Sequence, residues 1–133
     1  RTVSVRLFDS IVSQLVFGEP TLCQFSFACD QYLVVEHDGS VYPCDFCVRP
    51  DLRLGSVATD SWEKILSSPV RRAFAAAKTA NLPEKCRVCE YLRFCRGDCP
   101  RSGQRLCDGW KAFFGHALPR LRELAADAAG GMI

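Results

Sequence analysis

The chain has 133 residues, about one modest domain, and its hydrophobic content of 48% excludes a disordered protein. Its 17 basic and 15 acidic residues give a net charge of +2, which argues against nucleic acid or an anionic membrane as a partner. No apolar stretch approaches the ~20 residues that span a bilayer, and no secretory signal opens the chain. We therefore expect a cytoplasmic protein with no membrane partner.

Residues 1–18 are the first predicted element, a helix that ends at Gly18 and Pro20. Its apolar side chains recur at helical spacing and would form one stripe, made of Phe8, Ile11, Val12, Leu15 and Val16. The chain starts with Arg1 rather than Met. We therefore expect a piece of a longer protein, in which this stripe faces a core that a missing upstream domain could supply.

A β-hairpin is predicted over residues 30–46, because Asp38-Gly39 separates two stretches rich in β-forming residues. Cys29 lies at the start of this hairpin and Cys44 at its end. Antiparallel pairing brings the two ends together, so both thiols could reach one metal site.

Short elements are predicted to follow the hairpin. A short extended piece is expected around residues 54–57. Thr59 or Asp60 is then expected to cap a short helix, and a second helix is expected over residues 69–82, between two prolines.

The last third of the chain is divided between a cysteine-rich loop and a helix. Residues 84–109 hold five cysteines and few apolar residues, so we expect an irregular loop that metal, rather than hydrophobic burial, keeps folded. From Trp110 the pattern is helical again, and Pro119 is expected to kink or restart that helix. The end from Ala125 to Gly131 is expected to fray.

Cysteine is the most informative residue of the composition, with nine copies: Cys23, Cys29, Cys44, Cys47, Cys86, Cys89, Cys95, Cys99 and Cys107. Without a secretory signal this density favours metal over disulfides, and an odd count leaves one thiol over. Four thiolates complete one iron–sulfur cluster or one structural zinc site. The wider spacing of Cys95-x3-Cys99 favours iron–sulfur over a zinc ribbon, while zinc, disulfides and free thiols stay open on spacing alone.

The order of the cysteines resembles the motif of SPASM domains, which are C-terminal extensions of radical S-adenosylmethionine enzymes that modify peptides and proteins. The pattern runs Cys29-x9-Gly39-x4-Cys44, then Cys86-x2-Cys89-x5-Cys95-x3-Cys99, then Cys107. The resemblance covers residues 23–114. Within that group, four segments look like anaerobic sulfatase-maturating enzymes: VVEHDG (34–39), VYPCDF (41–46), LGSV (54–57) and FFGH (113–116).

The resemblance implies a SPASM-like α+β fold, with a small β-hairpin and short helices organised around two cysteine-ligated [4Fe–4S] clusters. Carried over by position, the first cluster is ligated by Cys23, Cys29, Cys44 and Cys99. The second is ligated by Cys86, Cys89, Cys95 and Cys107. Cys47 is then spare and is interpreted as a small buried hydrophobe.

Asp45 takes the position of the general base that deprotonates the substrate in this family, which would need a carboxylate that is partly desolvated near the cluster. The alternative for Asp45 is a turn residue that binds backbone amides. The domain limits expected from the resemblance are the end of a radical S-adenosylmethionine barrel over residues 1–20, the SPASM domain over 21–116, and a helix and tail over 117–133.

The implied activity of the parent protein is oxidation of a sulfatase Cys or Ser to formylglycine. The implied partners are a radical S-adenosylmethionine domain in cis, a sulfatase or other peptide substrate, and a reduced flavodoxin- or ferredoxin-type electron carrier. Such domains carry a Cys-x3-Cys-x2-Cys motif, whereas Ser102 follows Cys95 and Cys99 at the required position. We therefore expect S-adenosylmethionine only in the missing domain, and no catalysis by this chain alone.

Two other classes of protein remain as alternatives. One is a stand-alone iron–sulfur module for electron transfer or peptide recognition. The other is a structural zinc domain, and zinc could also replace labile clusters in a recombinant protein because thiolates bind both.

Overall fold

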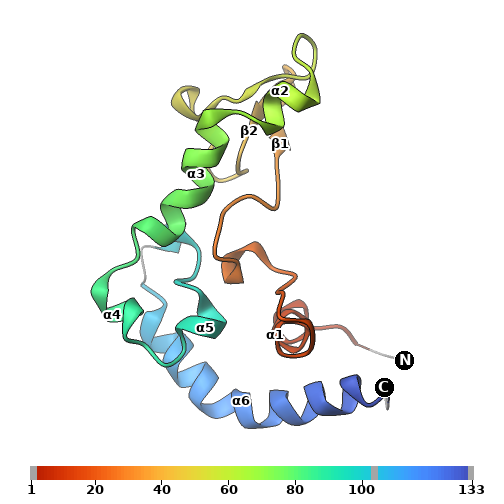
Figure 1. The fold of residues 1–133 in the computed structure, drawn as a ribbon, viewed down its shortest axis with the longest axis vertical. Coiled ribbons are helices and arrows are strands. Elements are labelled where there is room, and N and C mark those ends of the chain that lie inside the picture. The colour runs from red at the N-terminus through yellow and green to blue at the C-terminus, as the bar shows by residue number, and fades with distance from the viewer. Residues whose placement is uncertain (1–2, 103–104, 132–133) are drawn as a thin grey trace. The chain divides into compact units, whose positions relative to one another are not determined.

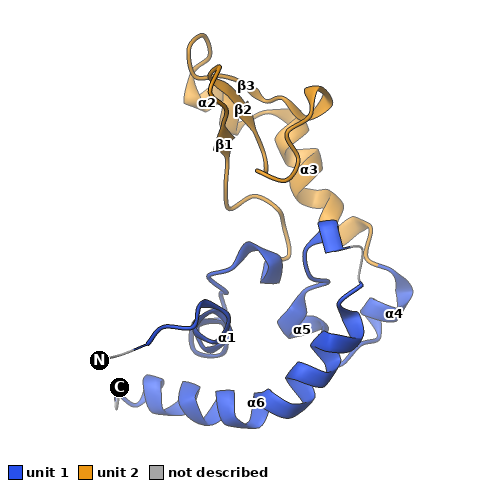
Figure 2. Ribbon diagram, turned by 180° about the vertical axis from the view of Figure 1, so that it is seen from behind, with its two compact units in different colours: residues 1–26, 83–133 blue, residues 27–82 orange. Residues whose placement is uncertain are grey.

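The computed structural model describes residues 3–102 and 105–131. The chain divides into two units (Figure 2): the first joins Arg1–Ser26 to Pro83–Ile133, and the second is Phe27–Leu82. The first unit is helical, while the second combines helices with a small antiparallel sheet. This mixture confirms the α+β prediction. The domain limits at residues 20 and 116 stay a prediction.

The second unit is built on a three-stranded sheet in the order β1–β2–β3 (Figure 2). Its strands are β1 (Val34–Val35), β2 (Ser40–Tyr42) and β3 (Gly55–Ser56), and both pairings are antiparallel. The hairpin prediction is confirmed, with Val35 opposite Val41. Gly39 turns the chain with a φ of 81°, a conformation that favours glycine. The Ser40 N–H donates to the Asp38 carboxylate at 2.8 Å, which lowers the pKa of Asp38.

The extended piece predicted around residues 54–57 is confirmed by β3, which leads into two helices. These are α2 (Trp62–Leu66) and α3 (Pro69–Ala80), with a 3-10 helix, η2 (Pro50–Leu52), before the third strand. The predicted cap of α2 was wrong, because the Ser61 side chain accepts the Lys64 N–H. Asp60 instead accepts the Ser56 N–H at 2.9 Å and pairs with Lys64. The hydrogen bond from Lys64 has the largest effect on the pKa of the Asp60 carboxyl, which it lowers, and the bond from the Ser56 N–H lowers it further.

The first unit places α1 (Arg6–Phe17) across the long helix α6 (Cys107–Ala129), as Figure 1 shows. Gly18 ends α1 in a left-handed conformation, as predicted. Two short helices and two 3-10 helices complete the unit: α4 (Glu84–Arg87), α5 (Leu92–Cys95), η1 (Cys23–Phe25) and η3 (Pro100–Ser102). The prediction of an irregular loop was therefore wrong where α4 and α5 form.

Aromatic side chains hold the cysteine segment in the first unit against α6. The Phe114 ring is fully buried, and the rings of Tyr91 and Phe94 lie 6.0 Å and 5.7 Å from it. The Gln14 side chain on α1 also donates to the Arg93 carbonyl at 2.7 Å. The expectation that this segment lacks a core of its own needs correction, because α6 and α1 supply one.

Helix α6 continues through Pro119 without restarting, and its ribbon bends (Figure 1). Pro119 has no N–H to donate to the carbonyl of Gly115 one turn earlier, which accounts for bending at such a position. The prediction that the chain frays from Ala125 was wrong for residues 125–129, because α6 continues to Ala129 and Ala125 is buried. Among the described residues, every helix is too short or too polar to cross a bilayer.

We predict that Phe114→Ala lowers the free energy of unfolding by about 3–5 kcal/mol, because it removes a buried ring from the centre of the first unit. Urea unfolding, followed by tryptophan fluorescence, measures the change. Phe17→Ala is the matched control, since that ring is 78% exposed, and it should cost about 0.5 kcal/mol or less. Equal effects of the two substitutions would contradict this account of the core.

Candidate metal centre

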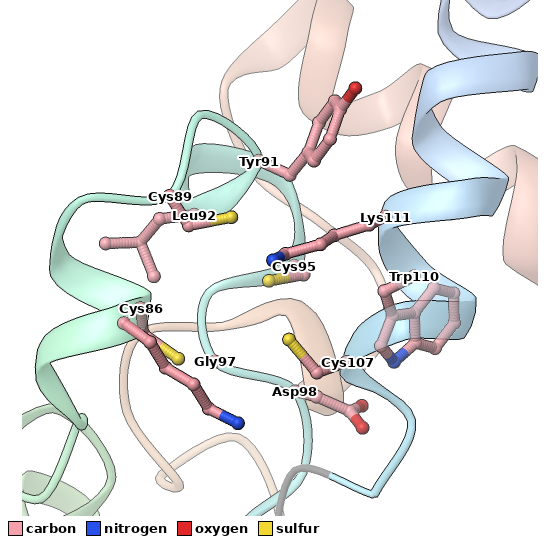
Figure 3. Close-up of a pocket in the computed structure, with 11 residues that line it drawn as sticks. Cys86, Cys89, Tyr91, Leu92, Cys95, Gly97, Asp98, Cys107, Trp110 and Lys111 are labelled. Carbon is pink, nitrogen blue, oxygen red and sulfur yellow. The ribbon is translucent and has the colours of Figure 1, made fainter.

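Four cysteines from three helical segments line one cavity in the first unit (Figure 3). Cys86 lies on α4, Cys89 follows it in a turn, Cys95 ends α5 and Cys107 begins α6. The space encloses about 430 Å³, including the part open to solvent. These are the four cysteines that the sequence resemblance assigns to the second cluster.

Tight turns bring these thiols to the cavity. The Cys89 N–H donates to the Cys86 carbonyl at 3.1 Å, and the Leu92 N–H donates to the Cys89 carbonyl at 3.0 Å. After Cys95 the chain reverses through three residues with positive φ: Arg96, Gly97 and Asp98. The Asp98 N–H closes this reversal on the Cys95 carbonyl at 2.7 Å. Because each turn is short, neighbouring cysteines face one space.

Thiols of the cavity raise one another's pKa. Burial raises the pKa of Cys86, and the nearby Cys107 and Cys89 raise it further, while Lys85 and Lys111 act in the opposite direction. Burial also raises the pKa of Cys95, with added contributions from Cys89 and Cys86. Metal ligation requires the thiolate form, and a bound cation would offset the repulsion between these negative charges.

The donor set fits a cofactor that is ligated by thiolates. In the described part of the chain, no group of three Cys, His, Asp or Glu side chains lies close enough together to coordinate a single metal ion. The four thiols line a wider space instead. Soft thiolates bind iron–sulfur clusters and zinc alike. The residues present therefore suit a thiolate-bound cluster, and donor chemistry alone leaves zinc as an alternative.

The cysteines predicted to hold the first cluster are divided between the two units. Cys23 and Cys99 belong to the first unit, whereas Cys29 and Cys44 belong to the second. In the second unit, the Cys29 N–H donates to the Ala75 carbonyl of α3 at 3.2 Å. This ligand set stays a prediction.

Cys44 and its neighbours lie after β2. Burial raises the pKa of the Cys44 thiol to about 11, and Cys47 and Asp45 add to this effect. The Cys44 thiol donates to the Asp45 Oδ1 at 3.5 Å. Asp45 is exposed, whereas we expected a partly desolvated carboxylate. Cys47 is half-buried, and its N–H donates to the Cys44 carbonyl at 3.0 Å.

Sequence reasoning missed the other residues that line the cavity, among them Lys85, Trp110 and Lys111. A signal for two of them was present. Trp110 and Lys111 follow Cys107 by three and four residues on one helix, which places them on the face of that cysteine. Asp98 is 6% exposed, and no group in the described chain is bonded to its buried Oδ2.

Comparison with known proteins identifies the family of the chain. The model of the SPASM family, described as an iron–sulfur cluster-binding domain, matches residues 23–90. The cysteine-type anaerobic sulfatase-maturating enzyme of Clostridium perfringens is 33% identical over 92% of this chain and 36% of its own. The serine-type enzyme of Bacteroides thetaiotaomicron is 28% identical over 86% of this chain and 30% of its own. The chain thus spans about a third of the length of these relatives.

A solved structure gives the same result for the fold. Native anSMEcpe with bound AdoMet and Kp18Cys peptide superposes with a TM-score of 0.86 at 31% identity, covering 94% of this chain and 37% of that one. The family match extends over half of the sequence and includes six of the nine cysteines. The chain therefore belongs to the SPASM family of iron–sulfur cluster-binding domains, in the branch whose relatives are anaerobic sulfatase-maturating enzymes.

Proposed function

We propose that this chain is the auxiliary-cluster domain of a radical S-adenosylmethionine enzyme that oxidises a sulfatase Cys or Ser to formylglycine. The observation that carries the proposal is the cavity lined by four cysteines in a SPASM chain. The names of the relatives, both cysteine-type and serine-type sulfatase-maturating enzymes, support the reaction. The radical domain would act in cis, because the relatives are about three times as long.

Two [4Fe–4S] clusters are proposed, each held by four thiolates. Cys86, Cys89, Cys95 and Cys107 would hold one in the cavity of the first unit. Cys23, Cys29, Cys44 and Cys99 would hold the other. Such a cluster, when bound, accepts and donates single electrons. The chain supplies the thiolates, and the aromatic side chains of Tyr91 and Trp110 line the same cavity.

Asp45 is proposed as the base that takes the proton from the substrate thiol or hydroxyl. It follows the proposed ligand Cys44 directly, and its exposed carboxylate is open to an incoming peptide. In the structure the Cys44 thiol donates to this carboxylate. Ligation would remove that thiol proton and leave the Asp45 oxygen free as an acceptor.

The proposed partners are the radical domain in cis and a peptide segment of a sulfatase. A flavodoxin- or ferredoxin-type carrier that supplies electrons to the enzyme is also a prediction, made from the family resemblance.

Anaerobic reconstitution with iron and sulfide should give about eight irons per chain, the content of two [4Fe–4S] centres. Cys86→Ala should lose about half of this iron, whereas Cys47→Ala should keep all of it. Iron and sulfide analysis, with EPR of the reduced protein, measures both. Tight stoichiometric zinc without any cluster would point to a structural zinc domain instead.

Alkylation should report the state of the Cys44 thiol. In the metal-free chain its rate should rise about tenfold per pH unit up to its pKa of about 11, because only the thiolate reacts. A free cysteine derivative, with a pKa near 8.5, should level off at lower pH. After reconstitution, mass spectrometry should find Cys44 protected and Cys47 still reactive. Protection of Cys47 in place of Cys44 would reverse the ligand assignment.

Asp45→Asn in the full-length enzyme should lower the rate of formylglycine formation by about 10²–10⁴-fold, because an amide cannot take the proton. Asp51→Asn is the matched control, since it makes the same change at an exposed carboxylate that only pairs with Arg49. Mass spectrometry of the peptide product measures the rates. An unchanged rate in Asp45→Asn would exclude the base role.

A further inference from the structure

Two lysines line the cavity of the four cysteines and have no part in ligation. Lys111 lies on α6 one helical turn after Cys107, so the two share a face of the helix. Figure 3 shows the Lys111 side chain extending from α6 into the cavity. Lys85 lies on α4 and directly precedes Cys86. The cations thus approach the cavity from different helices.

Both lysines bring a positive charge to the cavity that the four cysteines line. Within the described residues, no ion pair involves either lysine. Among the described residues that line the cavity, Asp98 is the one carboxylate. Two cations therefore outnumber one anion around the thiols.

We propose that Lys85 and Lys111 raise the reduction potential of the cluster held by Cys86, Cys89, Cys95 and Cys107. This inference rests on the proposed function, which assigns an iron–sulfur cluster to that cavity. Four thiolates make the site anionic, and reduction adds one more negative charge. A nearby ammonium group stabilises the reduced form more than the oxidised form. Net charge and hydrogen bonds to the sulfurs are known determinants of cluster potentials.

The consequence for the proposed reaction concerns the electron that the substrate radical gives up. The substrate radical, after losing its thiol or hydroxyl proton to Asp45, would be oxidised by one electron to the closed-shell product. The cluster, when bound, would take up that electron with no bond to the protein formed or broken, and a higher potential would favour the transfer. Lys85 and Lys111 are positioning residues in this scheme, because they act through the cluster and touch no substrate.

The test is a potentiometric titration of the reconstituted protein with dithionite, followed by EPR. Lys111→Gln and Lys85→Gln should each make one of the two centres about tenfold harder to reduce, which corresponds to a potential lower by about 59 mV. The other centre should keep its potential and serves as an internal reference. Lys111→Arg keeps the charge and should titrate like the wild type.

Arg122→Gln is the matched control for the charge change. Arg122 lies on the same helix, is exposed and does not line the cavity, so its loss should move neither potential. Unchanged potentials in both lysine variants, or an equal shift in Arg122→Gln, would overturn the inference and leave the proposed function standing. A wild-type chain that builds no cluster would overturn both. If Lys111→Gln does not fold, Lys85→Gln and Lys111→Arg still decide the matter.

Discussion

The arrangement of thiols depends on aromatic packing between the cysteine segment and α6. Helices α4 and α5 have four residues each, too few to be stable in water by themselves. Phe94 and Tyr91 stack on the buried Phe114, and this contact fixes the segment that carries Cys86, Cys89 and Cys95. The same helix supplies Cys107, so one packing interaction sets the position of all four thiols.

This packing also concentrates charge in a confined space. Four thiols that face one cavity repel one another once they are deprotonated, and burial adds to the cost of each charge. The lysines at the rim oppose that repulsion, while the buried Asp98 adds to it. A thiolate-bound cofactor and the surrounding side chains therefore form one electrostatic system, in which a change at any member alters the others.

The sequence predicted the elements whose signals are local. The Asp38-Gly39 turn and the apolar stripe of residues 1–18 both led to the correct elements, and the family resemblance, rather than the spacing alone, grouped the four thiols that line the cavity. Prediction from the sequence failed where tertiary contacts determine the structure. Four-residue helices carry no readable period, and the core role of Phe94 depends on the Phe114 ring, twenty residues further along the sequence. The sequence also did not indicate that the cysteines predicted to hold the first cluster are divided between two units.

The first unit is discontinuous in the sequence, because its two parts, Arg1–Ser26 and Pro83–Ile133, come before and after the residues of the second unit. On the ribosome, α1 emerges long before α6, the helix it packs against. The second unit is complete before the first can close. Three of the four cavity cysteines therefore leave the ribosome before Cys107 and α6 emerge to enclose them. Cofactor insertion into this cavity must then wait until α6 has emerged, and in the meantime the nascent thiols stay open to oxidants and to competing metals.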